Sequence, residues 1–249
     1  METRHLVLAG RLAAIIGILA MRGRFRAVSW AAHDFLWLYP TLRRNCDWHG
    51  DVLTHFETQE RAVWLTIDDG PGRTTPDILD VLARHNAKAT FFGIGKNIAA
   101  NPSLCARILA EGHTLENHTQ SHPAGWWWVM PRPLVRREIK AGSETILSAT
   151  GKRPRYFRSP VGMNNLSVHP IASELGLKVT GWSADGCDGC PAAPTAIATR
   201  IMRAIFPGAI ILMHENGGSR HAVVTLSRIL ARLDEAGYRT VIPSENALR

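Results

Sequence analysis

The sequence predicts an α/β fold, in which parallel strands form a closed or nearly closed barrel with helices around it. From residue 62 onward, short apolar runs typical of buried strands alternate with helical patterns, as in parallel sheets. Seven such runs suit a barrel better than an open, doubly wound sheet. No Gly-x-Gly-x-x-Gly motif follows the first run, which argues against a dinucleotide-binding fold. The length of 249 residues is ordinary for one such barrel.

The predicted strands are short apolar runs that end in polar or turn residues. The first run, AVWLTI at 62–67, leads directly into the turn sequence DDGPGRTTP. The predicted strands cover residues 62–67, 89–94, 113–118, 156–160, 178–184, 209–215 and 239–243.

The predicted helices carry residues that begin and end helices. Pro102 occupies a first helical position, and Gly112, Gly176 and Gly237 follow the ends of three helices. The predicted helices cover residues 76–85, 102–111, 133–149, 168–175, 195–205 and 219–236. Each of them connects two successive strands, as parallel pairing requires.

The basic charge of the chain is concentrated near its beginning. Residues 1–50 contain seven arginines and three acidic residues, so their net charge of +4 is half of the formal net charge of +8 of the whole chain. The rest is nearly balanced and has no long basic run and no nucleic-acid motif, so we expect no nucleic-acid partner. We therefore divide the chain into an N-terminal segment, residues 1–55, and a barrel domain, residues 56–249.

The N-terminal segment contains two apolar stretches. Residues 6–21 are apolar apart from Arg11 and two glycines, and residues 28–42 are rich in aromatic side chains that favour a bilayer interface. The aromatic residues are Trp30, Phe35, Trp37 and Tyr39. Between the stretches lie Arg22, Arg24 and Arg26. A signal peptide carries its charges before its apolar core, so cleavage is not expected.

Two interpretations of this segment remain open. It is either an interfacial or signal-anchor segment on an anionic membrane surface, or a helical hairpin packed on the barrel with solvated arginines. We expect a location in a bacterial-type cell envelope or at the inner membrane, with the cytoplasm as the alternative.

Five predicted strands end in, or are followed by, side chains that suit acid–base or metal chemistry. These residues are Asp68, Asp69, His118, His122, Arg158, Asp185, Asp188 and His214. The C-terminal ends of the strands share one face of an α/β barrel, and active sites lie there. A single Asp or His after a strand is usually a cap or turn residue, but five strands with such groups predict a functional site.

His118 and His122 predict a metal site at this face. On a helical turn, three intervening residues place both imidazoles on one side. Two histidines and one carboxylate suit divalent transition metals and leave positions open for water and substrate. Either Asp68 or Asp69 can supply the carboxylate, and the other can take a proton from the attacking water.

Two further residues could complete an acid–base set. Arg158 could hold the base through a charge-assisted hydrogen bond. His214 could protonate the leaving group, and a nearby Asp would raise its pKa.

Cysteine and tryptophan motifs lie close to this set. Cys187 and Cys190 are expected to form either a loop disulfide, which would fix Asp188 between them, or two ordinary thiols. Residues 126–128 are three tryptophans that follow the histidine motif; at least one is expected in the core, and we assign a sugar contact to Trp126.

Five ordered motifs resemble those of the NodB-type polysaccharide deacetylases, carbohydrate esterase family four. They are TIDDGP (66–71), HTQSHP (118–123), RSPVG (158–162), DGCD (185–188) and ILMH (211–214). The resemblance covers about residues 60–245. It implies a distorted (β/α) barrel of about seven strands, behind the N-terminal helical extension. It also implies a divalent metal, most often zinc, and removal of acyl groups from N-acetylated sugars or sometimes from other amides and esters.

The resemblance assigns a role to each polar residue. The metal ligands that it implies are Asp69, His118 and His122. Asp68 is implied as the general base, steadied by Arg158, and His214 as the general acid, tuned by Asp188. The backbone N–H of Val161 would stabilise the oxyanion together with the metal. Leu212 would form an apolar wall for the acyl methyl group.

Three positions depart from the family pattern. Ile67 replaces a Phe, which we expect to matter little, and Val161 replaces an aromatic residue, so that a side-chain contact to substrate is lost. Gly189 replaces a Trp, which either opens the pocket wall or transfers this role to another residue. These changes affect the prediction of the substrate more than that of the catalysis.

The sequence thus predicts a metal-dependent hydrolase that removes an N-acyl group, such as acetyl, from an amino sugar of a polysaccharide, oligosaccharide or glycolipid. One alternative is a deacylase or deformylase of a membrane-presented glycolipid or a small amide. Another is a catalytically silent carbohydrate-binding barrel. The presence of the complete ligand, base and acid set argues against the silent barrel.

Overall fold

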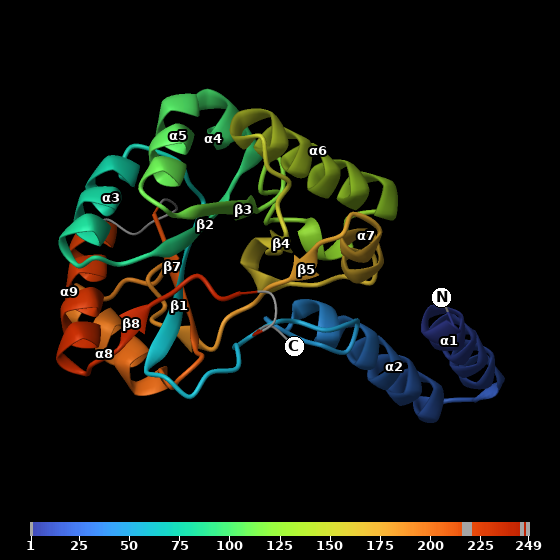
Figure 1. The fold of residues 1–249 in the computed structure, drawn as a ribbon. Helices are drawn as coiled ribbons and strands as arrows, with labels where there is room; N and C mark the ends of the chain where they lie inside the picture. Colours follow the sequence, from blue (N-terminus) through green and yellow to red (C-terminus); the bar gives the residue numbers. More distant parts are fainter. Residues whose placement is uncertain (1, 216–220, 245–246, 248–249) are drawn as a thin grey trace.

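The computed structural model describes residues 2–215, 221–244 and 247, and shows a curled parallel sheet with helices on its outer face (Figure 1). Seven strands lie in the order β5-β4-β3-β2-β1-β7-β6, and β8 pairs with the first residues of β1. The strands are β1 (Ala62–Asp68), β2 (Ala89–Gly93), β3 (Thr114–Asn117), β4 (Tyr156–Phe157), β5 (Lys178–Val179), β6 (Ala184–Asp185), β7 (Ile210–His214) and β8 (Arg239–Thr240). The predicted distorted barrel is confirmed in an incompletely closed form, because no ladder among the described residues joins β5 to β6.

In the described part of the chain, seven helices surround the sheet, and two more form a hairpin beside it (Figure 1). The surrounding helices are α3 (Thr75–Arg84), α4 (Gly95–Ala100), α5 (Pro102–Ala110), α6 (Arg132–Thr150), α7 (Val168–Glu174), α8 (Pro194–Ala204) and α9 (Ala222–Glu235). The hairpin consists of α1 (Glu2–Ala20) and α2 (Arg24–Leu42). The short 3-10 helices η1 (Trp127–Val129) and η2 (Pro160–Gly162) lie in loops.

The central strand β1 is buried along its whole length. Alternate side chains of a strand point to opposite faces. Accordingly, Val63, Leu65 and Ile67 pack with the apolar residues of the covering helices, whereas Trp64 belongs to the cluster inside the curl. The same alternation places Thr66 and Asp68 on the inner face. A carboxylate at the end of this strand is therefore held inside the barrel.

The predicted strand 178–184 is interrupted in the structure and appears as β5 and β6. Between them, the carbonyl oxygens of Thr180 and Gly181 accept hydrogen bonds from the Arg158 side chain. The carbonyl oxygen of Trp182 accepts from the Asn45 side chain, so these three oxygens of the break bind side chains and not a neighbouring strand.

Other predicted boundaries also differ. The strand predicted at 156–160 ends at Phe157, shortly before Pro160, which has no N–H to donate to a ladder. The helix predicted over 219–236 appears as α9, and its first two residues lie outside the described part of the chain. The short helix α4 was not predicted.

Residues just before β1 cover the open side of the sheet. Leu53 forms a parallel bridge with Thr180, and His55 forms an antiparallel bridge with Ala209, the residue before β7. The chain therefore passes between the β5 and β7 sides of the barrel before it enters the central strand.

The hairpin of α1 and α2 matches the predicted helical extension. Among the described residues, no helix combines the length and the apolar character that crossing a membrane requires. The side chains of residues 2–9, 36 and 37 lie outside what the structure describes, so the interfacial role expected for Trp37 stays a prediction.

Candidate active site

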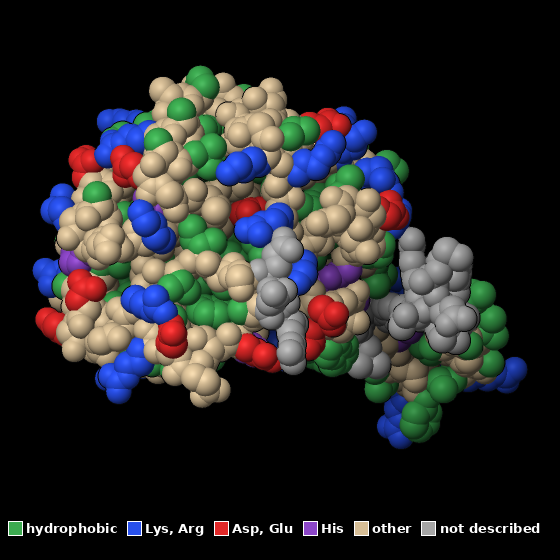
Figure 2. Space-filling view, in the orientation of Figure 1, with side chains coloured by type: hydrophobic (Ala, Val, Ile, Leu, Met, Phe, Trp, Pro, Cys, Tyr) green, Lys and Arg blue, Asp and Glu red, His purple; other side chains and the backbone are tan. Residues whose placement is uncertain are grey.

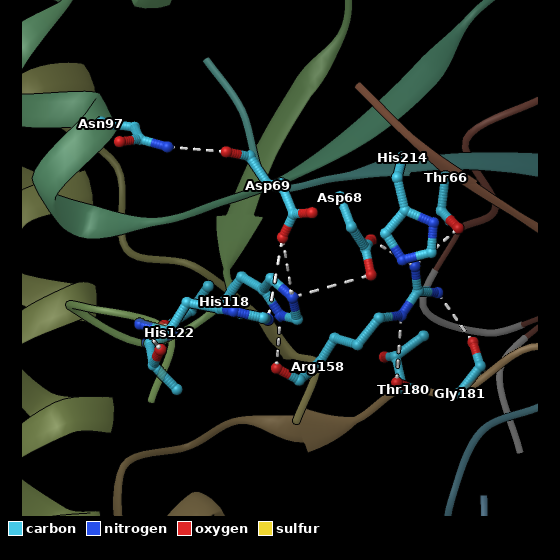
Figure 3. Close-up of polar contacts among 12 residues, drawn as sticks. Thr66, Asp68, Asp69, Asn97, His118, His122, Arg158, Thr180, Gly181 and His214 are labelled. Atoms are coloured by element: carbon cyan, nitrogen blue, oxygen red, sulfur yellow. Dashed lines mark hydrogen bonds and ion pairs between the residues drawn. The ribbon is translucent and has the colours of Figure 1, made fainter. Parts of the chain in front are cut away.

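Two adjacent aspartates at the end of β1 line one pocket through different backbone geometry. Asp68 continues the inward-facing set of the strand and is buried. In a continued strand Asp69 would point outward, but its φ of 77° is left-handed and returns the carboxylate to the pocket. The side-chain amide of Asn97 donates a hydrogen bond of 2.7 Å to the Asp69 carbonyl oxygen and holds this turn (Figure 3).

His118 and His122 lie in a loop after β3, so the helical turn predicted for them is wrong. Their ring centroids are nevertheless 4.7 Å apart. Thr119 and His122 adopt left-handed backbone, with φ of 67° and 52°, and the His122 N–H donates to Thr119 Oγ1 at 2.9 Å. Asn117 Oδ1 in turn accepts from the Thr119 N–H at 2.8 Å. Loop hydrogen bonds therefore achieve the pairing of imidazoles that we expected from a helix.

The environment of His118 determines which ring nitrogen is free. Its Nδ1 lies 2.8 Å from the Arg158 carbonyl oxygen, which can only accept, so Nδ1 carries the proton. Nε2 keeps its lone pair and lies 3.8 Å from Asp68 Oδ2 and 3.7 Å from Asp69 Oδ1. Burial lowers the pKa of His118 to about 3. The ring is therefore neutral, as a metal ligand must be.

The predicted metal ligands come together in the structure. One ligand atom from each of Asp69, His118 and His122 lies within 4.8 Å of the other two. A carboxylate oxygen and two imidazole nitrogens suit zinc and related divalent ions, and three protein ligands leave coordination positions open. Burial and the neighbouring charge of Asp68 raise the pKa of Asp69, and a cation bound here would favour its ionised form. The residues therefore fit a divalent metal.

Arg158 is a fully buried cation beside this set (Figure 3). Its Nη1 donates to Asp68 Oδ1 and to Thr66 Oγ1, both at 2.7 Å, and its Nη2 donates to the Gly181 carbonyl oxygen at 2.7 Å. The guanidinium carbon lies 4.2 Å from the centroid of the Phe92 ring. The polar contacts and the aromatic face together replace the water that the charge loses on burial.

The charge of Asp68 is determined by these neighbours. Burial alone would raise its pKa, but the positive charge of Arg158, followed by the charge of His214 and the hydrogen bond from Arg158, holds the pKa below its ordinary value. Asp68 is therefore ionised and can accept a proton.

His214, at the end of β7, has the opposite character. Burial tends to lower its pKa, but the hydrogen bond and charge of Asp188, followed by the charges of Asp68 and Asp69, raise it to about 9. The ring Nδ1 lies 2.7 Å from Asp188 Oδ1, and the His214 backbone N–H donates to Asp188 Oδ2 at 2.7 Å. His214 is therefore a cationic proton donor at neutral pH.

Asp188 is held by a small loop. It lies between Cys187 and Cys190, which form a disulfide, the first of the two alternatives considered for them. The bridge closes the loop around the carboxylate that orients His214.

The acid, the base and the metal ligands all line one pocket of 370 Å³. Its lining residues are Asp68, Asp69, Ile94, Asn97, His118, His122, Val161, Gly162, Trp182, Gly189 and His214. Asn97 and Trp182 were missed from the sequence. Asn97 lies on the unpredicted helix α4, shortly after the second predicted strand, and Trp182 lies in the middle of a predicted strand. The only signal for Asn97 in the sequence is that its polar side chain follows the end of the second predicted strand closely.

The residues predicted to contact substrate divide into two groups. Val161, with φ of 58°, and Gly189 line the pocket, and a Cβ at Gly189 would meet nothing within 4 Å, so the wall is open there. Leu212 is buried in the barrel interior, and Trp126 is exposed; neither lines the pocket. Trp127 is the tryptophan in the core.

Residues 55–180 match the sequence model of the polysaccharide deacetylases. The chain belongs to this family. It is 38% identical over 185 residues to a chitooligosaccharide deacetylase of Bradyrhizobium sp. (strain ANU 289), and the aligned region covers 73% of this chain and 79% of that protein. It is 33% identical over 208 residues to a peptidoglycan-N-acetylglucosamine deacetylase of Bacillus cereus, over 82% of this chain and 96% of that protein.

A solved structure agrees with the assignment of the family. The crystal structure of the Bc1960 peptidoglycan N-acetylglucosamine deacetylase superposes with a TM-score of 0.70 at 32% identity, over 76% of this chain and 88% of that one. The resemblance inferred from the five motifs is thus confirmed. Deacetylases hydrolyse carbon–nitrogen bonds other than peptide bonds, which is the predicted enzyme class.

We predict that Asp188→Asn lowers the pKa of His214 from its wild-type value of about 9, because the variant loses the negative charge at Nδ1. Imidazole NMR signals of the full chain, followed against pH, measure this shift. Asp185→Asn is the control, since it removes a carboxylate of the same region that bonds the Cys187 N–H instead. Equal His214 pKa values in wild type and Asp188→Asn would contradict the assignment.

The same pKa has a consequence for stability. A pKa raised from 6.5 to about 9 stabilises the fold fully below pH 6.5, and this contribution is lost as pH rises through about 9. Asp188→Asn should therefore narrow the difference in unfolding free energy between neutral and alkaline pH.

Proposed function

We propose that this protein is a metal-dependent deacetylase that hydrolyses the N-acetyl group of an amino sugar in an oligosaccharide or polysaccharide. The observation that carries the proposal is the convergence, in one pocket, of an ionised Asp68, a cationic His214 and the three-residue ligand set. Hydrolysis of an amide needs a base for water and an acid for the departing amine. The pocket holds both, with their pKa values shifted in opposite directions.

The ligand set supports zinc as the metal, held by Asp69, His118 and His122. A divalent cation there would supply Lewis-acid stabilisation of the acyl oxygen and lower the pKa of water. The protein prepares the site by keeping His118 neutral, with its proton on Nδ1 and its Nε2 lone pair free.

Asp68 is the proposed general base. Its Oδ1 is bound by Arg158, which leaves Oδ2, the oxygen nearer to His118 Nε2, to take the proton of the attacking water. Arg158 donates to Asp68 and cannot take its proton, so it orients the base without competing for its role.

His214 is the proposed general acid. Because Nδ1 is bound to Asp188, the other ring nitrogen is the one that can give a proton to the leaving amine. The Val161 backbone N–H, at a left-handed residue on the pocket wall, is the proposed donor to the oxyanion. We propose that Trp182 forms the aromatic wall that Gly189 cannot provide.

The relatives that deacetylate chitooligosaccharide and peptidoglycan favour a saccharide over a glycolipid or small amide as substrate. The silent-barrel alternative is disfavoured because the ligand set, the base and the acid are all in place.

We predict that His118→Ala loses the bound metal while the chain stays folded, because one of three ligands is removed. Elemental analysis after zinc loading and dialysis, together with circular dichroism, measures both. His113→Ala is the matched control: His113 is also buried with a pKa lowered to about 4, but it lies outside the pocket. Full zinc retention by His118→Ala would rule out this ligand set.

The activity itself is tested by acetate release from N-acetylated chito-oligosaccharides and peptidoglycan fragments with the zinc-loaded enzyme. Asp68→Asn keeps the shape of the base but not its charge, and should be slower by about a hundredfold to ten-thousandfold. Asp80→Asn, on the surface beside Arg107, should leave the rate unchanged. No acetate release by wild type from any of these saccharides would overturn the proposed function, and a full rate in Asp68→Asn would overturn the assigned base.

A further inference from the structure

The α1–α2 hairpin has an unusually apolar surface for a part of the chain that is not packed inside the barrel. Nine of the fifteen exposed large apolar side chains among the described residues belong to it. They are Leu12, Ile16, Leu19, Met21, Phe25, Val28, Phe35, Leu38 and Leu42. Of the remaining six, Trp48 follows the hairpin in the N-terminal segment and five belong to the barrel, which is much the larger part of the chain, so the hairpin is where apolar surface is concentrated.

The exposed side chains follow the helical period. On α1, Leu12, Ile16 and Leu19 are four and three residues apart, and on α2, Val28, Phe35 and Leu42 are each seven apart. Such spacings place side chains along one face of a helix. Each helix therefore carries an apolar stripe that the barrel leaves uncovered.

The turn between the two helices is basic. Arg22, Arg24 and Arg26 are all exposed there, beside Phe25, which is 68% exposed. The sequence has no acidic residue between Glu2 and Asp34, so nothing acidic on the adjoining parts of the hairpin neutralises these charges. In Figure 1 this turn is the end of the hairpin farthest from the barrel, and Figure 2 shows basic and apolar side chains at that end.

We propose that the hairpin docks the protein on an anionic lipid bilayer, with Arg22, Arg24 and Arg26 at the phosphate groups and Phe25 and Val28 in the apolar boundary. Charge complementarity selects this partner, because basic residues within an apolar surface suit a negatively charged interface that also accepts apolar side chains. A second copy that paired turn to turn would instead place three arginines against three arginines.

The connection from the hairpin to the barrel is short. Asn45, three residues after the end of α2, donates through its side-chain amide to the Trp182 carbonyl oxygen at 2.9 Å and through its backbone N–H to the Gly162 carbonyl oxygen at 3.1 Å. Both partners line the pocket. The proposed docking residues would therefore be connected to the active-site wall through α2 and Asn45.

Co-sedimentation of the full chain with vesicles tests this proposal. Vesicles of phosphatidylcholine with about 30% phosphatidylglycerol should bind the protein at least about tenfold more tightly than pure phosphatidylcholine. Raising the salt to about 0.5 M should release most of it, since exposed charges are screened. Equal binding to both vesicles, or none to either, would overturn the proposal.

Two variants and a matched control identify the docking residues. Replacement of Arg22, Arg24 and Arg26 by Glu should reduce binding to anionic vesicles at least about tenfold, and Phe25→Ser with Val28→Ser should also weaken it. The control replaces the exposed barrel residues Arg84, Lys152 and Arg153 by Glu, with the same change in net charge. An equal loss in this control would mean that net charge alone drives binding, which would overturn the role of the hairpin.

Self-association is measured in parallel by light scattering. A monomer at micromolar concentration that binds anionic vesicles supports the proposal. A dimer that the Phe25 and Val28 substitutions dissociate, with no vesicle binding by wild type, would show that a second copy covers the hairpin and would overturn it.

Discussion

Arg158 is a buried cation whose hydrogen bonds join three parts of the barrel. Its guanidinium reaches Thr66 and Asp68 on β1 and the carbonyl oxygen of Gly181 in the break between β5 and β6. Its backbone carbonyl accepts from His118 after β3. A guanidinium without solvent is tolerated only when most of its donors are used, so its surroundings must supply acceptors at fixed positions.

The need for acceptors around Arg158 accounts for three features of this barrel: the break in the sheet, the ionised state of Asp68 and the tautomer of His118. The break in the sheet after β5 frees two carbonyl oxygens for the guanidinium. The carboxylate of Asp68 stays ionised although it is buried, because the cation stabilises that form. The His118 tautomer is determined by the same residue through its main chain. Arg158 thus acts on both proposed groups: its side chain keeps the base Asp68 ionised, and its backbone carbonyl leaves Nε2 of the ligand His118 free for a metal.

The sequence was sufficient to predict the alternating strands and helices and the residues at the strand ends, because apolar runs and strand-terminal acids and histidines are local features. It could not predict how the loops bring these residues together. Asp69, Thr119 and His122 adopt left-handed backbone, which is uncommon outside glycine and rarest for a β-branched residue such as Thr119. Hydrogen bonds to Asn97 and Asn117 hold these turns. No local pattern shows such partners.

The remaining differences have the same origin. Residues 178–184 are predicted as one continuous strand, and the strand is interrupted where the carbonyl oxygens of residues 180–182 accept hydrogen bonds from Arg158 and Asn45, which are both distant in sequence. Leu212 was assigned to the acyl group by its motif, yet the inner face of β7 places it in the barrel interior below the pocket-lining residues. Trp126 has the right chemistry for a sugar but is exposed outside the pocket.

The most direct test of this account is a double-mutant cycle on the free energy of unfolding, measured by urea denaturation of the metal-free chain. Arg158→Met alone should destabilise the protein by about 3–5 kcal/mol, because it leaves the charge of Asp68 buried without a partner. In an Asp68→Asn background the same substitution should cost at least about 2 kcal/mol less. An equal cost in both backgrounds would show that Arg158 serves the packing of the barrel and not the charge of the proposed base.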